Sequence, residues 1–254
     1  MGALHEGHAS LLRRARRVAG RDGKVVVSIF VNPTQFGPKE DFTKYPRPLA
    51  ADLALCRKLG VDVVFHPPPP EMYPAGFSTL VDETDISKGL CGASRPGHFS
   101  GVCTVVLKLF SILQPHFAVF GLKDFQQCRV IARMVRDLNL PVRLVFHATV
   151  READGLAMSS RNAFLNPEER AEAPVMRRAL VAARDAFRGG QVKSARLRAI
   201  VEKSIGAARL ARVDYVHVVD GATLAPILSA KRGDTIAAAV FFGPTRLIDN
   251  IQLS

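Results

Sequence analysis

Residues 25–37 read Val25-Val26-Val27-Ser28-Ile29-Phe30-Val31-Asn32-Pro33-Thr34-Gln35-Phe36-Gly37, and this stretch decides the fold class. From Val25 to Val31 the residues are β-branched or otherwise apolar except for one serine, which predicts a strand buried on both faces. The remainder is rich in polar and turn-forming residues, so we expect the strand to end in a loop. Strands buried on both faces belong to parallel sheets that helices cover on each side.

Helical and strand patterns alternate on both sides of this stretch. An apolar stripe after His8 predicts a helix before it. After it, we expect helices at 48–59, 102–113 and 124–138 and strands at 61–65, 117–120 and 142–146. The prolines at 67–70 predict a stiff, extended connector. The alternation over residues 1–165 predicts an α/β domain, a Rossmann-like, doubly wound parallel sheet that binds ligands at the loops after its strands.

The pattern changes at Asn166. Asn166 and Pro167 are suited to the N-cap and the first position of a helix, which we expect to continue to about Phe187. A second helix should end near Ile205, and strand-like runs follow at 213–219, 235–241 and 246–251. Residues 166–254 are therefore predicted to form a separate, smaller C-terminal α+β domain.

The composition is that of a globular protein, with 254 residues of which 48% are hydrophobic and 23% charged. A net charge of +12 raises the possibility of a nucleic-acid partner. The arginines are spread along the predicted helices, however, and the chain has no Trp and only 3 Tyr for base stacking. We therefore favour a solvated arginine-rich surface without a nucleic-acid partner, which also suits an anionic substrate.

Location and cysteine chemistry follow from absences in the sequence. No apolar run is long enough to span a bilayer, and charged residues interrupt any signal-peptide pattern at the start, so we expect no membrane partner and a cytoplasmic location. The cysteines form no Cys-x-x-Cys pair and no zinc-ligand spacing with histidine. We expect them to be small buried hydrophobes, without disulfides or structural zinc; they are Cys56, Cys91, Cys103 and Cys128.

The segment His5-Glu6-Gly7-His8 opens the first predicted helix. A glycine-containing loop at a helix N-terminus presents backbone N–H groups to phosphates, and two imidazoles can donate hydrogen bonds to them as charge develops. Two histidines three residues apart can also chelate a metal, although no further ligand stands out. A plain loop with two exposed histidines is the third interpretation. Taken alone, the motif leaves these alternatives open.

Three other polar segments follow predicted strands or turns. Asn32 and Gln35 offer amides that both donate to and accept from a polar substrate. Lys123 stands where a strand passes into a helix, a place suited to a phosphate ligand, and Asp124 suits either a helix cap or a Mg²⁺ ligand. Arg161 follows two serines after a turn signal. With Lys123 and the two histidines, Arg161 completes a predicted clamp for a polyphosphate.

These segments occur in order over nearly the whole chain. They are Met1-Gly2-Ala3-Leu4-His5-Glu6-Gly7-His8, residues 28–37, Glu40-Asp41, Tyr45-Pro46-Arg47, residues 95–102, Gly121-Leu122-Lys123-Asp124, Met158-Ser159-Ser160-Arg161-Asn162 and residues 245–250. The ordered set resembles the pantothenate synthetase family, the pantoate–β-alanine ligases. The resemblance implies a fold similar to class I aminoacyl-tRNA synthetases and other nucleotidyltransferases with a His-x-Gly-His loop. It further implies that pantoate reacts with ATP-Mg²⁺ to give pantoyl adenylate and pyrophosphate, and that β-alanine then displaces AMP to give pantothenate.

The resemblance also assigns roles to residues. His8 would be the proton donor, and His5, Lys123 and Arg161 would act on the phosphates. Gln35 would contact pantoate and β-alanine, and Gln127 pantoate. Asn32 and Tyr45 would support them, and Asp124 is the candidate Mg²⁺ ligand. The implied ATP site comprises Met1, Gly2, Ala3, Leu4, His5, Glu6, Gly7, His8, Gly121, Leu122, Lys123, Asp124, Val150, Met158, Ser159, Ser160 and Arg161. The C-terminal domain would be a lid, and the family implies a homodimer.

Two features depart from the family pattern. Leu122 stands where the family usually has Glu, which should be tolerable if Lys123 and Asp124 act on phosphate and metal. Family members also carry a strand of the central sheet ahead of the segment that starts here at Met1. Either the start is assigned wrongly or the chain is shortened, so we expect the sheet to lack its first strand and residues 1–254 to show poor stability or low activity.

Three alternative functions remain. A different nucleotidyltransferase with the same loop, such as a cytidylyltransferase, is disfavoured by residues 32–37 and by His98, which belong to the pantoate side in the resemblance. A nucleic-acid-binding module is suggested only by the charge. A non-catalytic relative is supported only by the position of the start.

Overall fold

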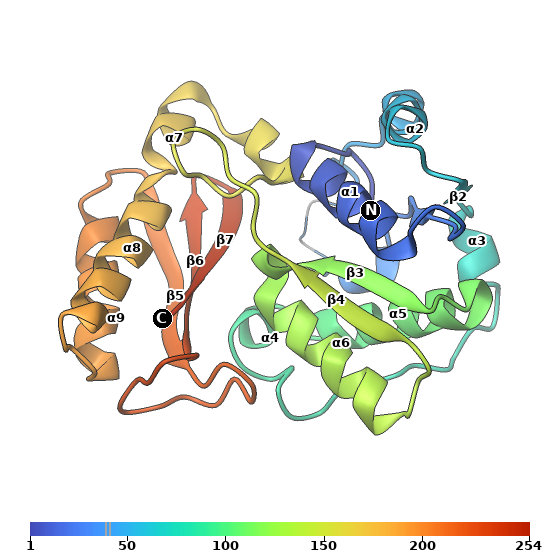
Figure 1. Cartoon of the computed structure of the whole chain (residues 1–254). Coiled ribbons are helices and arrows are strands. Elements are labelled where there is room, and N and C mark those ends of the chain that lie inside the picture. The colour runs from blue at the N-terminus through green and yellow to red at the C-terminus, as the bar shows by residue number, and fades with distance from the viewer. Residues whose placement is uncertain (39, 41) are drawn as a thin grey trace.

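The computed structural model describes residues 1–38, 40 and 42–254; Lys39 and Asp41 lie outside the described residues (Figure 1). The N-terminal part contains α1 (Glu6–Ala19), β1 (Val26–Ser28), η1 (Pro33–Gln35), α2 (Leu49–Lys58), β2 (Val63–Phe65), α3 (Pro69–Met72), α4 (Cys91–Ser94), α5 (His98–Leu113), β3 (Phe117–Gly121), η2 (Leu122–Asp124), α6 (Phe125–Asp137), β4 (Arg143–His147) and η3 (Ser160–Phe164). The C-terminal part contains α7 (Pro167–Glu172), α8 (Val175–Arg188), α9 (Ser194–Gly206), β5 (Ala211–Val219), β6 (Thr235–Phe242) and β7 (Thr245–Gln252). Every predicted strand is present, within a few residues of its predicted bounds.

The described parallel strands form two pairs, β1 with β2 and β3 with β4, and not one continuous sheet. Each pair therefore has an unpaired edge. On β1 the edge away from β2 holds Met1, whose amino group donates to the Ser28 carbonyl at 2.9 Å and whose carbonyl accepts from the Phe30 N–H at 2.9 Å. This is the hydrogen-bond pattern of a parallel bridge. The α/β class with parallel strands is confirmed, with the strands split into two pairs.

The predicted long helix from Pro167 is wrong in one respect. It divides into α7 and α8 around Pro174, because proline lacks the N–H that a continuous helix needs. Its start is as predicted: Asn166 caps the Glu169 N–H at 2.9 Å, and the Glu169 carboxylate accepts from the Asn166 N–H at 3.0 Å. The proline run after β2 is also only partly extended, since Pro69 starts the short helix α3.

The antiparallel sheet β5-β6-β7 lies between two sets of helices (Figure 1). One face packs against α8 and α9, through residues such as Leu180, Leu197 and Ile236. The other face contributes Val219 and Ala237 to the core of the N-terminal part, together with side chains of α5 and α6. The C-terminal sheet therefore shares apolar core with the part of the chain that carries the predicted nucleotide loops.

Candidate active site

A cavity of about 890 Å³ lies between the two parallel strand pairs, with walls from α1, β1, α5, β3 and the segments 148–150 and 158–161. Gln35 and Gln127 line it. Of the predicted ATP-site residues, those that line it are Met1, His5, Gly7, His8, Gly121, Lys123, Asp124, Val150, Met158, Ser159, Ser160 and Arg161. The folding of the chain therefore brings together loops that are up to about 150 residues apart in sequence.

Five predicted ATP-site residues do not line this cavity: Gly2, Ala3, Leu4, Glu6 and Leu122. The Glu6 carboxylate forms an ion pair with Arg13 on the exposed face of α1. The Leu122 side chain packs against the apolar core of the N-terminal part. The side chains of Glu6 and Leu122 are therefore directed away from the cavity.

His5 and His8 face each other at the start of α1, with ring centroids 4.1 Å apart. The Nδ1 atom of His5 accepts from the Gly7 N–H at 3.1 Å, and Nδ1 of His8 accepts from the His5 N–H at 3.3 Å. A ring nitrogen that accepts carries no proton, so in both neutral rings the proton is on Nε2. Both histidines are thus hydrogen-bond donors through Nε2.

The electrostatic surroundings keep these imidazoles neutral. Burial, followed by the nearby His5 ring, the amino terminus and Lys123, lowers the pKa of His8 to about 3. The pKa of His5 is lowered by burial and by Lys123. A neutral Nε2–H can stabilise charge that builds on a phosphate without carrying a permanent charge itself. His8 is therefore a neutral ring whose Nε2–H is able to donate a hydrogen bond.

The backbone of the loop that precedes α1 is held by Asp52, a residue of α2 whose side chain is buried at 2% exposure. Its carboxylate accepts from the Ala3 N–H at 3.0 Å and from the Leu4 N–H at 2.7 Å. Ala3 has a φ of 49°, a left-handed conformation that costs about 1–2 kcal/mol for a residue with a Cβ, and the carboxylate offsets this cost. The N–H groups of Ala3 and Leu4 are therefore occupied by the Asp52 carboxylate.

Sequence analysis missed Asp52. The signal that was present is a single acidic residue within the apolar stretch 49–56, next to Leu53 and one turn before Cys56. A carboxylate placed among apolar side chains needs partners, because an unpaired buried charge is costly. Sequence alone does not show which loop supplies them.

Lys123 and Asp124 lie on the short helix η2, between β3 and α6. The Lys123 ammonium is 3.7 Å from the Asp124 carboxylate, and both side chains line the cavity. No group of three or more His, Cys, Asp or Glu residues that could hold a metal ion is found in the described part of the chain. A metal ion at Asp124 would thus need most of its ligands from a phosphate and water, which is the usual situation for Mg²⁺.

The segment 158–161, which leads into η3, forms another wall of the cavity. Ser159 caps this short helix by accepting from the Arg161 N–H at 3.2 Å. The Ser160 hydroxyl is 2.7 Å from the Tyr45 hydroxyl, and the Arg161 guanidinium lies 5.8 Å from the centroid of the Tyr45 ring. Tyr45, predicted as a supporting residue, therefore contacts the two cavity-lining residues that follow Ser159.

The amide of Gln35 is oriented by Asn32, which is 3% exposed. Asn32 Nδ2 donates to the Gln35 side-chain oxygen at 3.2 Å and to the Gly101 carbonyl at 3.1 Å, while its oxygen accepts from the Tyr73 hydroxyl at 2.7 Å. Gln35 lines the cavity, so Asn32 fixes an amide that can meet a substrate. The predicted supporting role of Asn32 is consistent with these contacts, and Tyr73 is a partner that sequence analysis missed.

Two adjacent glutamines on α6 have different environments. Gln127 lines the cavity. Gln126 is buried, donates to the carbonyls of Ile86 at 3.0 Å and Gly89 at 2.7 Å, and accepts from the Cys91 N–H at 2.9 Å. Gln126 therefore holds the irregular 86–91 segment, and only Gln127 is placed to meet a substrate.

Comparison with known proteins is consistent with this arrangement. The family described as "Pantoate-beta-alanine ligase" matches residues 1–252. Curated relatives include pantothenate synthetases of Heliobacterium modesticaldum, 55% identical over 99% of this chain and 88% of the relative, and of Thermotoga neapolitana, 52% identical over 100% and 89%. The chain belongs to the pantoate–β-alanine ligase family.

Solved structures of the family agree in fold. The pantothenate synthetase of Thermus thermophilus superposes with a TM-score of 0.95 at 47% identity, covering 100% of this chain and 91% of that one. A pantoate–β-alanine ligase from Francisella tularensis, described as complexed with beta-gamma ATP and beta-alanine, superposes with a TM-score of 0.79 at 33% identity, covering 99% and 87%. The predicted fold class and the membership of a ligase family are thereby confirmed.

Leu122 shows how this member of the pantoate–β-alanine ligase family accommodates an apolar residue in the second loop. Its side chain packs against the core, while its carbonyl accepts a hydrogen bond from Asn250 of β7 at 2.8 Å. The backbone, and not the side chain, thus connects this position to the rest of the site.

No helix in the described residues is long and apolar enough to cross a membrane.

Proposed function

We propose that this chain catalyses the ATP-dependent condensation of pantoate with β-alanine to pantothenate, through a pantoyl adenylate. The observation that carries the proposal is that phosphate-binding groups and amide groups for a polar acid line one cavity. His5, His8 and Lys123 are the phosphate-binding groups, and Gln35 and Gln127 are the amides; all five line the same cavity. The Francisella tularensis relative, described as complexed with beta-gamma ATP and beta-alanine, supports a site that takes both.

In the first half-reaction, a carboxylate oxygen of pantoate attacks the α-phosphorus of ATP. The bond from that phosphorus to the bridging oxygen breaks, and pyrophosphate leaves with the electron pair. The Nε2–H groups of His5 and His8 and the Lys123 ammonium stabilise the charge on the phosphate oxygens, and Arg161 adds a further positive charge. Catalysis then consists of positioning and charge stabilisation, without a covalent enzyme intermediate.

In the second half-reaction, the amine nitrogen of β-alanine attacks the acyl carbon of the adenylate. The bond from that carbon to the AMP oxygen breaks, AMP leaves, and the new amide nitrogen loses a proton. Gln35 is assigned to both acids because it lines the cavity and its side-chain oxygen is held by Asn32. Gln127, which lines the same cavity, is assigned to pantoate.

Mg²⁺ is part of the proposal. The residues fit a metal ion that arrives with ATP, because Asp124 offers a carboxylate beside Lys123 and the phosphates would supply most other ligands. When bound, the ion neutralises phosphate charge.

The arrangement of the parts is proposed as residues 1–165 binding both substrates and residues 166–254 forming a lid, in a cytoplasmic homodimer. The lid assignment is supported by the contacts of β7 with the loops that follow β3 and β4.

An assay of the released nucleotide tests the reaction. With ATP, Mg²⁺, pantoate and labelled pyrophosphate, we expect label to exchange into ATP; AMP should appear only when β-alanine is added. Pyrophosphate release from CTP without AMP would favour a cytidylyltransferase instead. Salt-dependent binding to arbitrary duplex without ATP turnover would favour a nucleic-acid-binding module. Absence of both ATP turnover and duplex binding in folded protein would point to a non-catalytic relative.

A further inference from the structure

The strand β7 contacts the lysine-bearing turn of the N-terminal part. Asn250, on β7, extends its side-chain amide to η2, where Nδ2 donates to the Leu122 carbonyl at 2.8 Å and to the Lys123 carbonyl at 3.1 Å. Both acceptors belong to the turn that carries the Lys123 side chain into the cavity. One amide group thus fixes two successive peptide planes at the base of Lys123.

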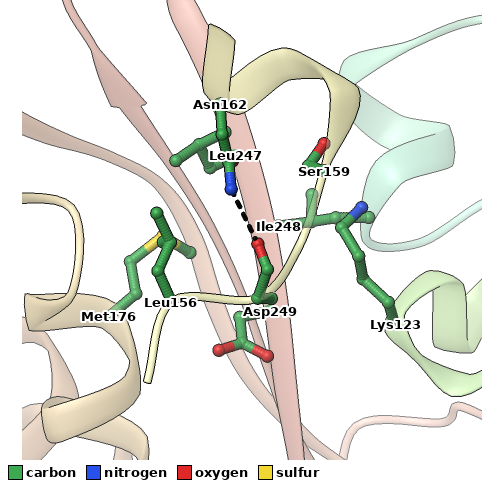
Figure 2. A pocket seen from close by; sticks show the side chains of 9 residues that line it. Lys123, Leu156, Ser159, Asn162, Met176, Leu247, Ile248 and Asp249 are labelled. Carbon is green, nitrogen blue, oxygen red and sulfur yellow. Dashed lines mark hydrogen bonds between the residues drawn. The ribbon is translucent and has the colours of Figure 1, made fainter. Parts of the chain in front are cut away.

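The preceding residue on the same strand holds a different loop. The Asp249 carboxylate, 4% exposed, accepts from both terminal nitrogens of Arg151, at 2.7 and 2.9 Å. Arg151 in turn donates to the Gly155 carbonyl at 3.1 Å, within the turn that joins Val150 to Met158. Successive side chains of a strand point to opposite faces, so Asp249 and Asn250 reach two different loops. Figure 2 shows Asp249 and Ile248 of β7 between Lys123 on one side and Leu156 and Met176 on the other.

The hydrogen bonds of Asn250 are not needed merely to dock the C-terminal part. That docking has its own contacts, among them the bond from Ser94 to Asp214 at 2.9 Å and the 3.2 Å contact between the Cys91 thiol and the Tyr215 hydroxyl, in addition to the shared apolar core. The turn η2 has no side-chain cap of its own in the described residues, since neither Gly121 nor Asp124 caps a backbone N–H there. The orientation of the Lys123 peptide therefore depends on a group supplied from outside the turn.

We propose that Asn250 is a positioning residue for Lys123, and that β7 thereby sets the geometry of the phosphate site. This inference rests on the proposed function, in which Lys123 stabilises charge during adenylation. Asn250 does not touch the substrate; it acts through the main chain of η2. Since misplacement of a catalytic group by about 1 Å can cost roughly a hundredfold in rate, loss of this bond should affect chemistry more than binding.

The test measures pantoate-dependent exchange of pyrophosphate into ATP, which reports adenylation alone, for Asn250→Ala, Lys123→Ala and the double variant. We expect Asn250→Ala to lower the maximal exchange rate roughly ten- to hundredfold, with less than about a threefold change in the KM for ATP. Because both residues act at one point, adding Asn250→Ala to Lys123→Ala should cause little further loss. Asn250→Gln, which keeps the donor amide, should recover part of the rate.

Ser94→Ala is the matched control, because it removes a contact between the two parts of the chain without touching η2. It should exchange at the wild-type rate. If Asn250→Ala and Lys123→Ala instead lower the rate independently, so that their factors multiply, Asn250 has only a structural role. Wild-type exchange by a folded Asn250→Ala protein also overturns the inference. Wild-type exchange by Lys123→Ala would instead overturn the role of Lys123 in the proposed function, which separates the two failures.

Discussion

The imidazole of His98 holds the backbone of Gln35. Its Nδ1 lies 2.8 Å from the Gln35 carbonyl oxygen, and its Nε2 lies 2.9 Å from a guanidinium nitrogen of Arg95. Because a carbonyl can only accept and a guanidinium can only donate, the neutral ring carries its proton on Nδ1 and accepts at Nε2. Arg95 also contacts the Gln35 carbonyl at 3.2 Å and pairs with Glu40 at 2.6 Å. The proposed pantoate contact thus rests on a fixed tautomer of His98.

His98→Ala should weaken binding of the two acids. Without the Nδ1–H donor, Gln35 loses its fixed position, so we expect the KM for pantoate to rise roughly tenfold while the KM for ATP stays near the wild-type value. Steady-state kinetics with each substrate varied in turn measures this difference. His98→Asn keeps a donor near the Nδ1 position and should recover most of the affinity. An equal rise in both KM values would show that His98 supports the whole site and not Gln35.

Stability should fall in mild acid because of buried neutral histidines. Burial lowers the pKa of His98 to about 4 and that of His8 to about 3, from an ordinary value of 6.5. Between pH 6.5 and the lowered pKa values, the unfolded chain binds protons at these histidines that the folded chain does not. Their contribution to stability is therefore present above pH 6.5 and declines as the pH falls below it. From pH 7 to 5 the loss should reach about 2 kcal/mol for each histidine, since one pKa unit is worth about 1.4 kcal/mol.

Urea unfolding at pH 7 and at pH 5 measures this loss. The paired carboxylates respond mainly at lower pH, because their pKa values are lowered from ordinary values near 4, as for Glu40 and Asp62. The window therefore reports the histidines together with the amino terminus, whose pKa burial lowers to about 6. His98→Asn should reduce the dependence on pH even if it is less stable at pH 7. An unchanged slope in this variant would mean that His98 is protonated in the folded protein.

His8→Ala and Lys123→Ala should each lower adenylation by roughly a hundredfold or more, because each removes a group aimed at developing phosphate charge. Single-turnover formation of the adenylate measures the rate, and circular dichroism checks the fold. Arg17→Ala is a suitable control, since it removes an exposed positive charge from α1. Adenylate formation at the normal rate in both site variants would refute the phosphate-clamp assignment.

The two glutamines of α6 give a matched pair of variants. Gln126→Ala leaves the carbonyls of Ile86 and Gly89 and the N–H of Cys91 without their partner and should cost about 2–4 kcal/mol of unfolding free energy. Gln127→Ala should leave stability within about 0.5 kcal/mol and raise the KM for pantoate. Thermal unfolding and kinetics of both proteins provide the comparison. The assignment fails if the two variants show the same pattern.

The elements of the fold were predictable because their signals are local. The apolar run ending at Val31 and the cap at Asn166 act within a few residues, and both appear in the structure. Pro174 was overlooked because the apolar periodicity continues across it, although its ring ends the helix. Which strands pair depends on distant backbone groups, so the division into two parallel pairs is not visible in the pattern.

The site was predictable to the extent that strand ends converge. The loops containing His8, Lys123 and Arg161 were placed together for that reason and because of the family resemblance. The groups that fix these loops were not predicted: Asp52 lies 49 positions from Ala3, and Asn250 lies 127 positions from Lys123. Asp and Asn are common in any sequence, and only the tertiary fold distinguishes those that bind a loop backbone from those that face solvent.

Gly101 is a residue near the acid site where backbone packing limits substitution. It lies in α5 against η1, and a Cβ there would come within 2.4 Å of the Thr34 carbonyl oxygen, which is backbone and cannot easily move. Gly101→Ala should therefore push η1 away and cost at least about 2 kcal/mol of unfolding free energy. Because η1 carries Gln35, the variant should also lose affinity for pantoate, while its affinity for ATP stays near the wild-type value.

Gly206→Ala is the matched control for this substitution. Gly206 also lies in a helix, α9, but a Cβ there would meet nothing within 4 Å, so alanine should be neutral or stabilising by about 0.5–1 kcal/mol. Chemical denaturation of the two variants compares the same chemical change in closed and open surroundings. If Gly101→Ala unfolds at the wild-type denaturant concentration, η1 can move away from α5 at little cost. Normal pantoate affinity in that protein would then show that the position of η1 does not control the acid site.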